Sequence, residues 1–235
     1  MDALDAVAAG LAGPSLVLPF EAIDLEALPG IVERALAWKD VDLLINNAGV
    51  TQRSLALDTD FDVYRRLMEV DYFAPLRLTQ LVLPRMVARR SGHLSVVSSM
   101  AGKVGSPLRT GYSAAKHACV GYFDSLRAEI EDAHGISVSV ILPGAVATPI
   151  TLSALAGDGS PHDQADPLIA GGMGPSRAAE IILNGIAEGW REIPVGSDIE
   201  REMLRMRAHE PEALFAVMAN LGAGLAAARG HGRDA

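Results

Sequence analysis

The sequence contains one cysteine, Cys119, few aromatic residues and no long uninterrupted apolar run. A single cysteine excludes an intrachain disulfide and a cysteine-based zinc site, and the six histidines lack the spacing of metal ligands. No segment approaches the roughly 20 apolar residues of a membrane span. The first ten residues also lack the basic and apolar regions of a signal peptide. We therefore expect a cytoplasmic protein with no bound metal and no membrane segment.

Charge and composition narrow the class of protein further. The formal net charge is −9 and the sequence has no basic stripe, which argues against a nucleic-acid partner. Aromatic residues make up only 5% of the chain, and small and aliphatic residues dominate it. Such a composition favours helices packed on a parallel sheet. The length of 235 residues predicts a single domain over 1–235.

Short apolar segments alternate with longer helical patterns, which predicts an α/β fold with a doubly wound parallel sheet. We expect strands at 15–18, 41–45, 93–98, 136–142 and Glu192–Val195. We expect helices at 24–38 with Asp24 as its cap, at 60–90 with bends at Pro75 and Pro84, at 111–134, at 176–190 with Ser176 as its cap, and from 198 onward. We expect residues 149–175 to form a mobile loop with a short helix near 151–155. We expect residues 222–235 to form a frayed tail.

Small and polar residues follow three of these strands. They are the turn Asn46-Asn47-Ala48-Gly49, the pair Ser98-Ser99 and the pair Pro143-Gly144. In a doubly wound sheet, ligands bind beyond the carboxyl ends of the strands. The sequence therefore predicts one crevice that is lined by all three segments.

Tyr112 and Lys116 are separated by four positions on one helical face, thirteen or more residues after Ser99. A phenol with a pKa of about 10 is a poor base near neutrality, but a neighbouring ammonium favours its ionised form. A serine hydroxyl nearby can bond a substrate oxygen while the proton moves. These three residues predict a proton-transfer site.

Ser99 with Tyr112-x-x-x-Lys116, the Asn-Asn-Ala-Gly turn, and Pro143-Gly144 with Thr148 resemble the motifs of the short-chain dehydrogenase/reductase family. Their order and spacing agree with the family over about 15–195. The stretch 98–126 is similar to the branch that includes dehydrogenase/reductase member 7-type proteins. The resemblance implies a Rossmann-like fold and an oxidoreductase that uses NAD or NADP to interconvert an alcohol and a ketone or aldehyde.

The resemblance also implies roles for single residues. Tyr112 would be the acid/base, Lys116 would assist it and bond the nicotinamide ribose, and Ser99 would orient the substrate carbonyl. The other cofactor-binding residues would be Asn46, Ala48, Gly49, Pro143, Gly144 and Thr148. Residues 149–175 would form the substrate lid, and the helix that bears Tyr112 would pack between subunits of a homo-oligomer.

The sequence departs from the family pattern at its beginning. The family opens with a strand, a Gly-x-x-x-Gly-x-Gly turn that binds the pyrophosphate, and a helix. Gly10 and Gly13 do not match that turn. We expect the first strand-helix-strand unit, about 30 residues or more, to be absent from a shortened chain. Strand 41–45 would then be an edge that strand 15–18 or another chain covers. A cofactor-deficient remnant or partner-binding pseudoenzyme is therefore the alternative function.

Two residues differ from those that the family usually carries at the same positions. Asp71 stands where the family normally carries Asn, and a carboxylate there would stabilise the Lys116 ammonium while it offsets the pull of that ammonium on Tyr112. We expect Asp71 to act in catalysis by weakening it. Glu21 stands where the family usually places an Asp near the adenine ring, and it is equally consistent with an exposed residue before a helix.

Overall fold

The computed structural model describes residues 2–162, 164 and 166–233. Four parallel strands form one sheet in the order β1-β2-β3-β4. The strands are β1 (Leu43–Asn46), β2 (Gly92–Val97), β3 (Ile136–Pro143) and β4 (Glu192–Val195). The α-helices are α1 (Asp2–Ala9), α2 (Leu28–Trp38), α3 (Phe61–Met68), α4 (Ala74–Arg89), α5 (Thr110–His134), α6 (Pro167–Ala170), α7 (Pro175–Ala187), α8 (Asp198–His209) and α9 (Pro211–Arg233).

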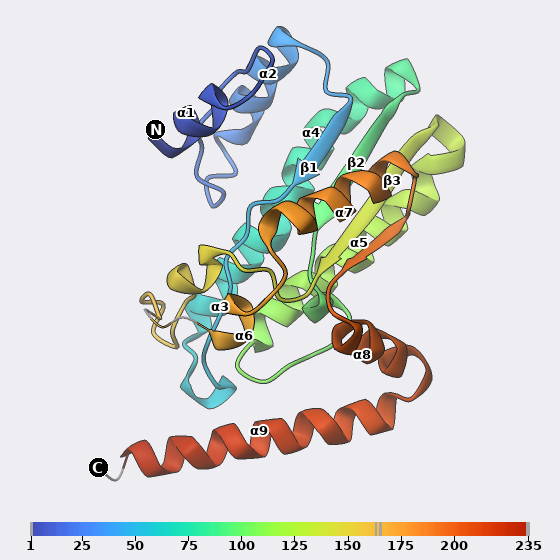
Figure 1. Ribbon diagram of the computed structural model, residues 1–235. Coiled ribbons are helices and arrows are strands. Elements are labelled where there is room, and N and C mark those ends of the chain that lie inside the picture. Colours follow the sequence, from blue (N-terminus) through green and yellow to red (C-terminus); the bar gives the residue numbers. More distant parts are fainter. Residues whose placement is uncertain (1, 163, 165, 234–235) are drawn as a thin grey trace.

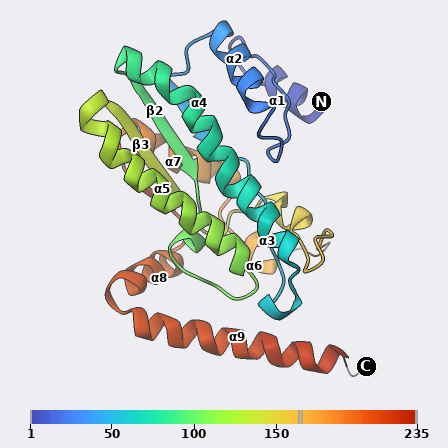
Figure 2. The ribbon, with the colours of Figure 1, turned by 180° about the vertical axis from the view of Figure 1, so that it is seen from behind.

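Helices cover both faces of the sheet, which confirms the predicted doubly wound fold. In Figure 1, α7 lies over one face, and Figure 2 shows α4 and α5 over the other. The larger core lies between the sheet and α4 and α5, where Met86 and Phe123 pack on Leu94 and Val138. A smaller core joins the sheet to α7. Apolar residues on both sides of the parallel strands explain why β3 is buried along nearly its whole length.

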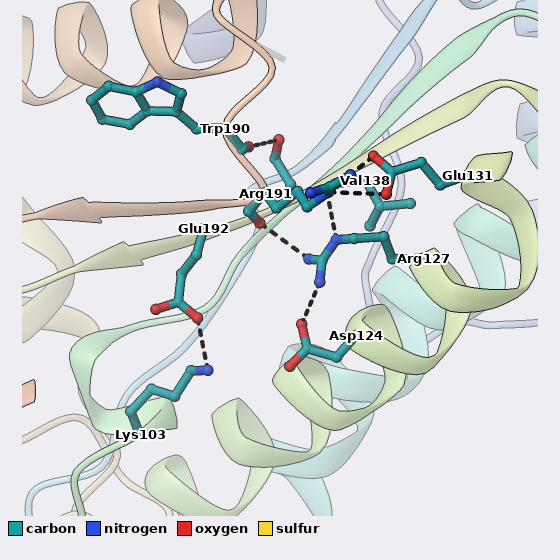
Figure 3. A network of polar contacts seen from close by, with 9 residues as sticks. Lys103, Asp124, Arg127, Glu131, Val138, Trp190, Arg191 and Glu192 are labelled. Atoms are coloured by element: carbon teal, nitrogen blue, oxygen red, sulfur yellow. Dashed lines mark hydrogen bonds and ion pairs between the residues drawn. The ribbon is translucent and has the colours of Figure 1, made fainter. Parts of the chain in front are cut away.

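Polar contacts fix the far end of α5 to the sheet (Figure 3). Arg127 on α5 donates from Nε to the carbonyl of Val138 at 3.0 Å and from Nη2 to the carbonyl of Arg191 at 3.1 Å. Arg191 in turn donates from Nε to Glu131 Oε2 at 3.0 Å. These bonds join α5 to β3 and to the residue before β4. The helix that carries Tyr112 is therefore anchored on the strands at this end.

The predicted strand at 15–18 is wrong, because these residues form an irregular segment. Pro14 and Pro19 flank them, and neither proline has an N–H group for a sheet hydrogen bond. No described residue before Leu43 belongs to a strand of the sheet. As predicted, the strand that follows is an edge, and its Leu43 and Ile45 side chains are partly exposed.

Two helices begin later or earlier than predicted, and proline explains both differences. Helix α2 begins at Leu28, not at Asp24, whose side chain instead accepts the Ala27 N–H in a preceding turn. Helix α7 begins at Pro175 after the cap residue Gly174, not after Ser176. Proline fits the first turn of a helix, where its missing N–H costs nothing.

The predicted helical region 60–90 consists of α3, a π-turn (Glu69–Phe73) and α4. Pro75 stands in the first turn of α4, so the π-turn falls just before it, and Pro84 lies inside α4. A π-turn adds one residue to a helical turn, and such turns often lie at functional sites. Asp71 is in the middle of this π-turn and is buried.

The C-terminal segment differs from the prediction in two respects. Residues 222–233, predicted to be frayed, belong to α9, and residues 234–235 lie outside the described residues. In Figure 1, α9 runs along the outside of the molecule. Its part Pro211–Arg229 is long and apolar enough, by length and composition, to cross a membrane, and 6% of it is buried. The sequence did not suggest such a segment because nine of its nineteen residues are alanine or glycine rather than large apolar residues.

Gly102, in the 3₁₀ turn Met100–Gly102 between β2 and α5, leads to a test of the packing around the site. A Cβ there would contact Ser98 Oγ and lie 2.9 Å from the main-chain oxygen of Lys116. Gly102→Ala should therefore lower the free energy of unfolding by roughly 1–3 kcal/mol, measured by urea denaturation. Gly105→Ala is the matched control, because an added Cβ there meets no atom within 4 Å. Equal losses of stability in the two variants would contradict this packing.

Candidate active site

A cavity of about 640 Å³ opens at the carboxyl ends of the strands. The three segments that the sequence placed there do converge, since residues from the turn after β1, from the end of β2 and from the end of β3 all line it. Of the predicted site residues, the cavity is lined by Ala48, Gly49, Ser99, Tyr112, Lys116, Pro143, Gly144 and Thr148. Two others, Asn46 and Asp71, do not line it.

Tyr112 and Lys116 lie one turn apart on α5, and both face the cavity. Lys116 Nζ is 5.6 Å from the centre of the Tyr112 ring. The Tyr112 ring packs against Val63, Leu67 and Leu155. This apolar packing holds the ring, while the neighbouring ammonium supplies a positive charge close to it.

Lys116 also forms an ion pair with Asp71, which lies outside the cavity wall. Its Nζ is 3.1 Å from Asp71 Oδ1, and the side chains are only 5% and 0% exposed. Lys116 Nζ donates to the carbonyl of Val97 at 3.1 Å, and the Val50 N–H donates to Asp71 Oδ1 at 3.1 Å. Cys119 donates its thiol hydrogen to the carbonyl of Asp71. The expected proximity of Asp71 and Lys116 is thus present in the structure.

Burial and charge act in opposite directions on this pair. Burial raises the pKa of the Asp71 carboxyl, although the Lys116 ammonium and the Val50 N–H oppose that rise. Burial also disfavours the Lys116 ammonium, but the Asp71 carboxylate and other neighbours outweigh it, so the pKa of Lys116 is raised. Burial raises the pKa of the Cys119 thiol to about 11, so the thiol stays protonated. Lys116 is therefore a cation in the neutral pH range.

Ser99 follows the end of β2 and faces the same cavity as Tyr112. Its Oγ donates to the carbonyl of Pro143 at 3.2 Å and accepts the Ala101 N–H at 3.1 Å. These two bonds tie the end of β2 to the end of β3 and begin the 3₁₀ turn that leads to α5. The hydroxyl is thereby held at the cavity wall.

The Asn46 side chain lies beside the large cavity and not in its wall. Its Nδ2 donates to Thr79 Oγ1 at 3.2 Å and to the carbonyl of Ser95 at 3.3 Å. As the last residue of β1, Asn46 turns its side chain toward α4 and β2. It borders a smaller cavity of about 140 Å³ next to the large one. Asn47 is the residue of this pair that lines the large cavity.

Sequence reasoning missed several residues at the site. Thr51 and Arg109 line the cavity, and Arg109 donates to the buried Asp166 of the predicted lid at 3.0 Å. Glu200 on α8 accepts the Ala145 N–H at 2.6 Å and lies against Gly144. Ser197 and Glu200 form a capping box at the start of α8, a feature that was not recognised in the sequence. The contact of Glu200 with the turn after β3 joins residues more than fifty positions apart. No local sequence pattern indicates such a contact.

Comparisons with known proteins show the family of the chain. The sequence model of the family described as short chain dehydrogenase matches residues 5–158. The dehydrogenase/reductase SDR family member 7B of Bos taurus is 38% identical over 202 residues, which cover 86% of this chain and 62% of that protein. The chain thus spans less than two-thirds of that relative. The branch predicted from residues 98–126 includes proteins of this type.

Solved structures share the fold. A short-chain dehydrogenase from Streptomyces avermitilis gives a TM-score of 0.75 at 27% identity, over 98% of this chain and 86% of that chain. A short chain dehydrogenase from Burkholderia cenocepacia, solved in complex with NADP, gives a TM-score of 0.72 at 24% identity, over 86% of this chain and 80% of that chain. Together with the family model and the curated relative, these results show that the chain belongs to the short-chain dehydrogenase family.

Proposed function

We propose that the protein is an NAD(P)-dependent oxidoreductase that interconverts an alcohol and a ketone or aldehyde. One observation carries the proposal: Ser99, Tyr112 and Lys116 line the wall of a single cavity at the carboxyl ends of the strands. The hydroxyl comes from the end of β2, and the phenol and the ammonium come from α5. A hydroxyl, a phenol and a cation around one carbonyl-sized position suit proton transfer to or from a substrate oxygen.

The proton chemistry follows from these groups. In the oxidative direction, the Tyr112 oxygen takes the proton of the substrate hydroxyl, and in the reductive direction it returns a proton to the carbonyl oxygen. The Ser99 hydroxyl rotates from the Pro143 carbonyl to donate to the same substrate oxygen and orients it. The Lys116 ammonium stabilises the negative charge on the Tyr112 oxygen. When it is bound, the nicotinamide cofactor supplies or accepts the hydride.

The residues around the cavity fit the nicotinamide end of such a cofactor. Ala48 and Gly49 would line its adenosine side, and Pro143, Gly144 and Thr148 would lie by the nicotinamide and the phosphates. Small residues at these places leave room for a flat ring, and Lys116 offers an ammonium to a ribose hydroxyl. The Burkholderia cenocepacia relative in complex with NADP supports this choice of cofactor. Residues 149–175, which contribute Ile150 and Thr151 to the cavity, would be the substrate lid.

A partner-binding protein that keeps the site but binds no dinucleotide is the alternative function. The Gly-x-x-x-Gly-x-Gly segment, the usual holder of the pyrophosphate, is not among these 235 residues, so dinucleotide binding by this chain has to be measured directly. The retained Ser99, Tyr112 and Lys116 favour the enzyme. Cofactor binding separates the two functions.

The remaining expectations stay predictions. A homo-oligomer is supported by the exposed apolar residues Phe215, Val217 and Leu221 of α9, and light scattering would measure its size. The cytoplasmic location and the lack of a membrane segment also stay predictions. Cell fractionation of the protein with and without α9 would test both. The net charge of −9 supports the expected lack of a nucleic-acid partner.

Titration with dinucleotides tests the proposed function directly. A ligand that binds the native state raises the melting temperature by mass action. We expect at least one of NAD⁺, NADH, NADP⁺ and NADPH to raise it in a dose-dependent manner, measured by differential scanning fluorimetry. Adenosine monophosphate is the control for binding of a nucleotide alone. No shift with any of the four dinucleotides at millimolar concentration would favour the partner-binding alternative.

Asp71→Asn tests whether the buried carboxylate limits catalysis. The carboxylate raises the pKa of Lys116, and its negative charge also offsets the effect of the ammonium on Tyr112. Without it, the charge of the Lys116 ammonium is no longer offset and acts more strongly on the Tyr112 oxygen. We therefore expect turnover near pH 7 to rise several-fold.

The matched control for this test is Asp124→Asn. Asp124 is on α5 and, like Asp71, forms an ion pair with a basic residue, but its partner Arg127 does not line the cavity, whereas Lys116 does. Its turnover near pH 7 should match that of the unmodified protein. An Asp71→Asn variant that folds normally but shows no gain in turnover would contradict the proposed effect of the carboxylate.

A further inference from the structure

We propose that Gln52 is a positioning residue for Tyr112, whose side-chain amide caps the first turn of α5 from a different segment of the chain. The proposal rests on the proposed function, in which Tyr112 moves the proton. It concerns a residue that does not line the cavity and has no place in the proton chemistry itself.

Every polar atom of the Gln52 side chain is engaged, and the residue is 0% exposed. Oε1 accepts the main-chain N–H of Gly111 at 2.8 Å. Nε2 donates to Ser54 Oγ and to Thr59 Oγ1, each at 3.1 Å. Thr59 uses its own hydroxyl hydrogen on the carbonyl of Leu55, so its oxygen can only accept from Gln52. The orientation of the amide is therefore fixed, with its oxygen toward α5.

The start of α5 needs a partner of this kind. The first N–H groups of a helix have no acceptor within the helix, and a side chain at the cap position usually provides one. Arg109 is the cap residue of α5, and its side chain makes no capping hydrogen bond. Gln52 supplies an acceptor to Gly111, the residue directly before Tyr112. The bond therefore holds the turn from which the Tyr112 side chain projects.

Close packing at Gly111 makes this attachment tight. A Cβ at Gly111 would lie 2.7 Å from Leu67 Cδ1, 2.8 Å from Tyr64 Cδ1 and 3.1 Å from Gln52 Oε1. The glycine thus lets α3 and the Gln52 amide approach the backbone of α5. A small movement of Gln52 would be passed to the first turn of α5, because no gap separates them.

The same segment holds the predicted lid. Leu155 donates its N–H to the carbonyl of Thr51 at 2.8 Å, and the Arg53 N–H donates to the carbonyl of Leu155 at 2.9 Å. The Arg53 guanidinium also pairs with Asp166 at 2.6 Å. Gln52 therefore lies between two residues that bind the lid while its own side chain binds the Tyr112 helix. The position of Tyr112 and the position of the lid are fixed on one piece of chain.

The test compares two substitutions of Gln52 in the full chain with saturating cofactor. Gln52→Met keeps the size and removes every hydrogen bond, which leaves the Gly111 N–H without an acceptor. Gln52→Glu keeps an oxygen that accepts this N–H and loses only the two hydrogen bonds that Nε2 donates to Ser54 and Thr59. We expect kcat to fall about tenfold or more in Gln52→Met with KM changed less than threefold, because misplacement of the acid/base slows the chemical step. Gln52→Glu should recover most of kcat.

The matched control is Gln80→Met, an exposed glutamine on α4, which should leave both constants unchanged. A purely structural role for Gln52 predicts equal losses in Gln52→Met and Gln52→Glu that follow the fall in melting temperature. That result would overturn the proposal. An unchanged kcat in Gln52→Met would overturn it as well.

Amide hydrogen exchange provides a measurement that does not need turnover. Gln52→Met should accelerate exchange in the first turn of α5, at Gly111 and its neighbours, and leave the middle of the helix near Phe123 unchanged. If the unmodified protein turns over no substrate, the proposed function fails, and this measurement still decides the positioning role. Unchanged exchange at Gly111, or equal acceleration along all of α5, would overturn it.

Discussion

The buried ion pair between Asp71 and Lys116 is the interaction on which the site depends. Asp71 receives the Val50 N–H from the turn after β1, and Lys116 donates to the carbonyl of Val97 at the end of β2. Two charged groups thus connect the π-turn, two strand ends and α5 at one point inside the protein. A buried pair contributes little net stability, but the loss of one partner leaves an uncompensated charge. The pair therefore specifies where α5 lies relative to the strands, and with it the place of Tyr112.

The rest of the site surrounds this point in layers. Ser99 joins the ends of β2 and β3 in front of the pair. Gln52 fixes the first turn of α5, and Arg127 anchors its other half to β3 and to the residue before β4. The catalytic helix is thus held at its beginning, at Lys116 and in its second half by different elements. A rigid arrangement of this kind suits proton transfer, which requires acid and acceptor within hydrogen-bonding distance.

Much of the fold followed from local pattern. The strand Glu192–Val195 was predicted residue for residue, and the helix around Tyr112 was predicted within one residue of Thr110–His134. The helix was predictable because its apolar residues recur with helical periodicity and because Gly135 follows its last residue. The strand at 15–18 was wrong because a strand exists only with a partner, and its apolar pattern could not show that none lies beside it. The π-turn at Asp71 could not be predicted, since only the position of Pro75 hints at it.

The site was predictable where strand ends meet and unpredictable where distant segments touch. Residues that follow strands share one edge of a parallel sheet, so the convergence of Ser99, Gly49 and Gly144 followed from topology. The side chain of Asn46 shares that edge, yet it turns toward α4, because the alternation of side chains along β1 points it there. Gln52 carried no recognisable signal, since its bond to Gly111 spans fifty-nine positions. Such contacts depend on the packed structure and not on any local sequence.

The central claim is that Tyr112 transfers the proton at a site held by Lys116 and Ser99. The most direct measurement is the rate of carbonyl reduction by the unmodified protein and by Tyr112→Phe, with Tyr122→Phe on the same helix as the control. The account predicts that loss of the Tyr112 hydroxyl lowers kcat by roughly 10²–10⁴-fold, that the fold is retained, and that Tyr122→Phe keeps its rate. A Tyr112→Phe variant that turns over substrate as fast as the unmodified protein would contradict it.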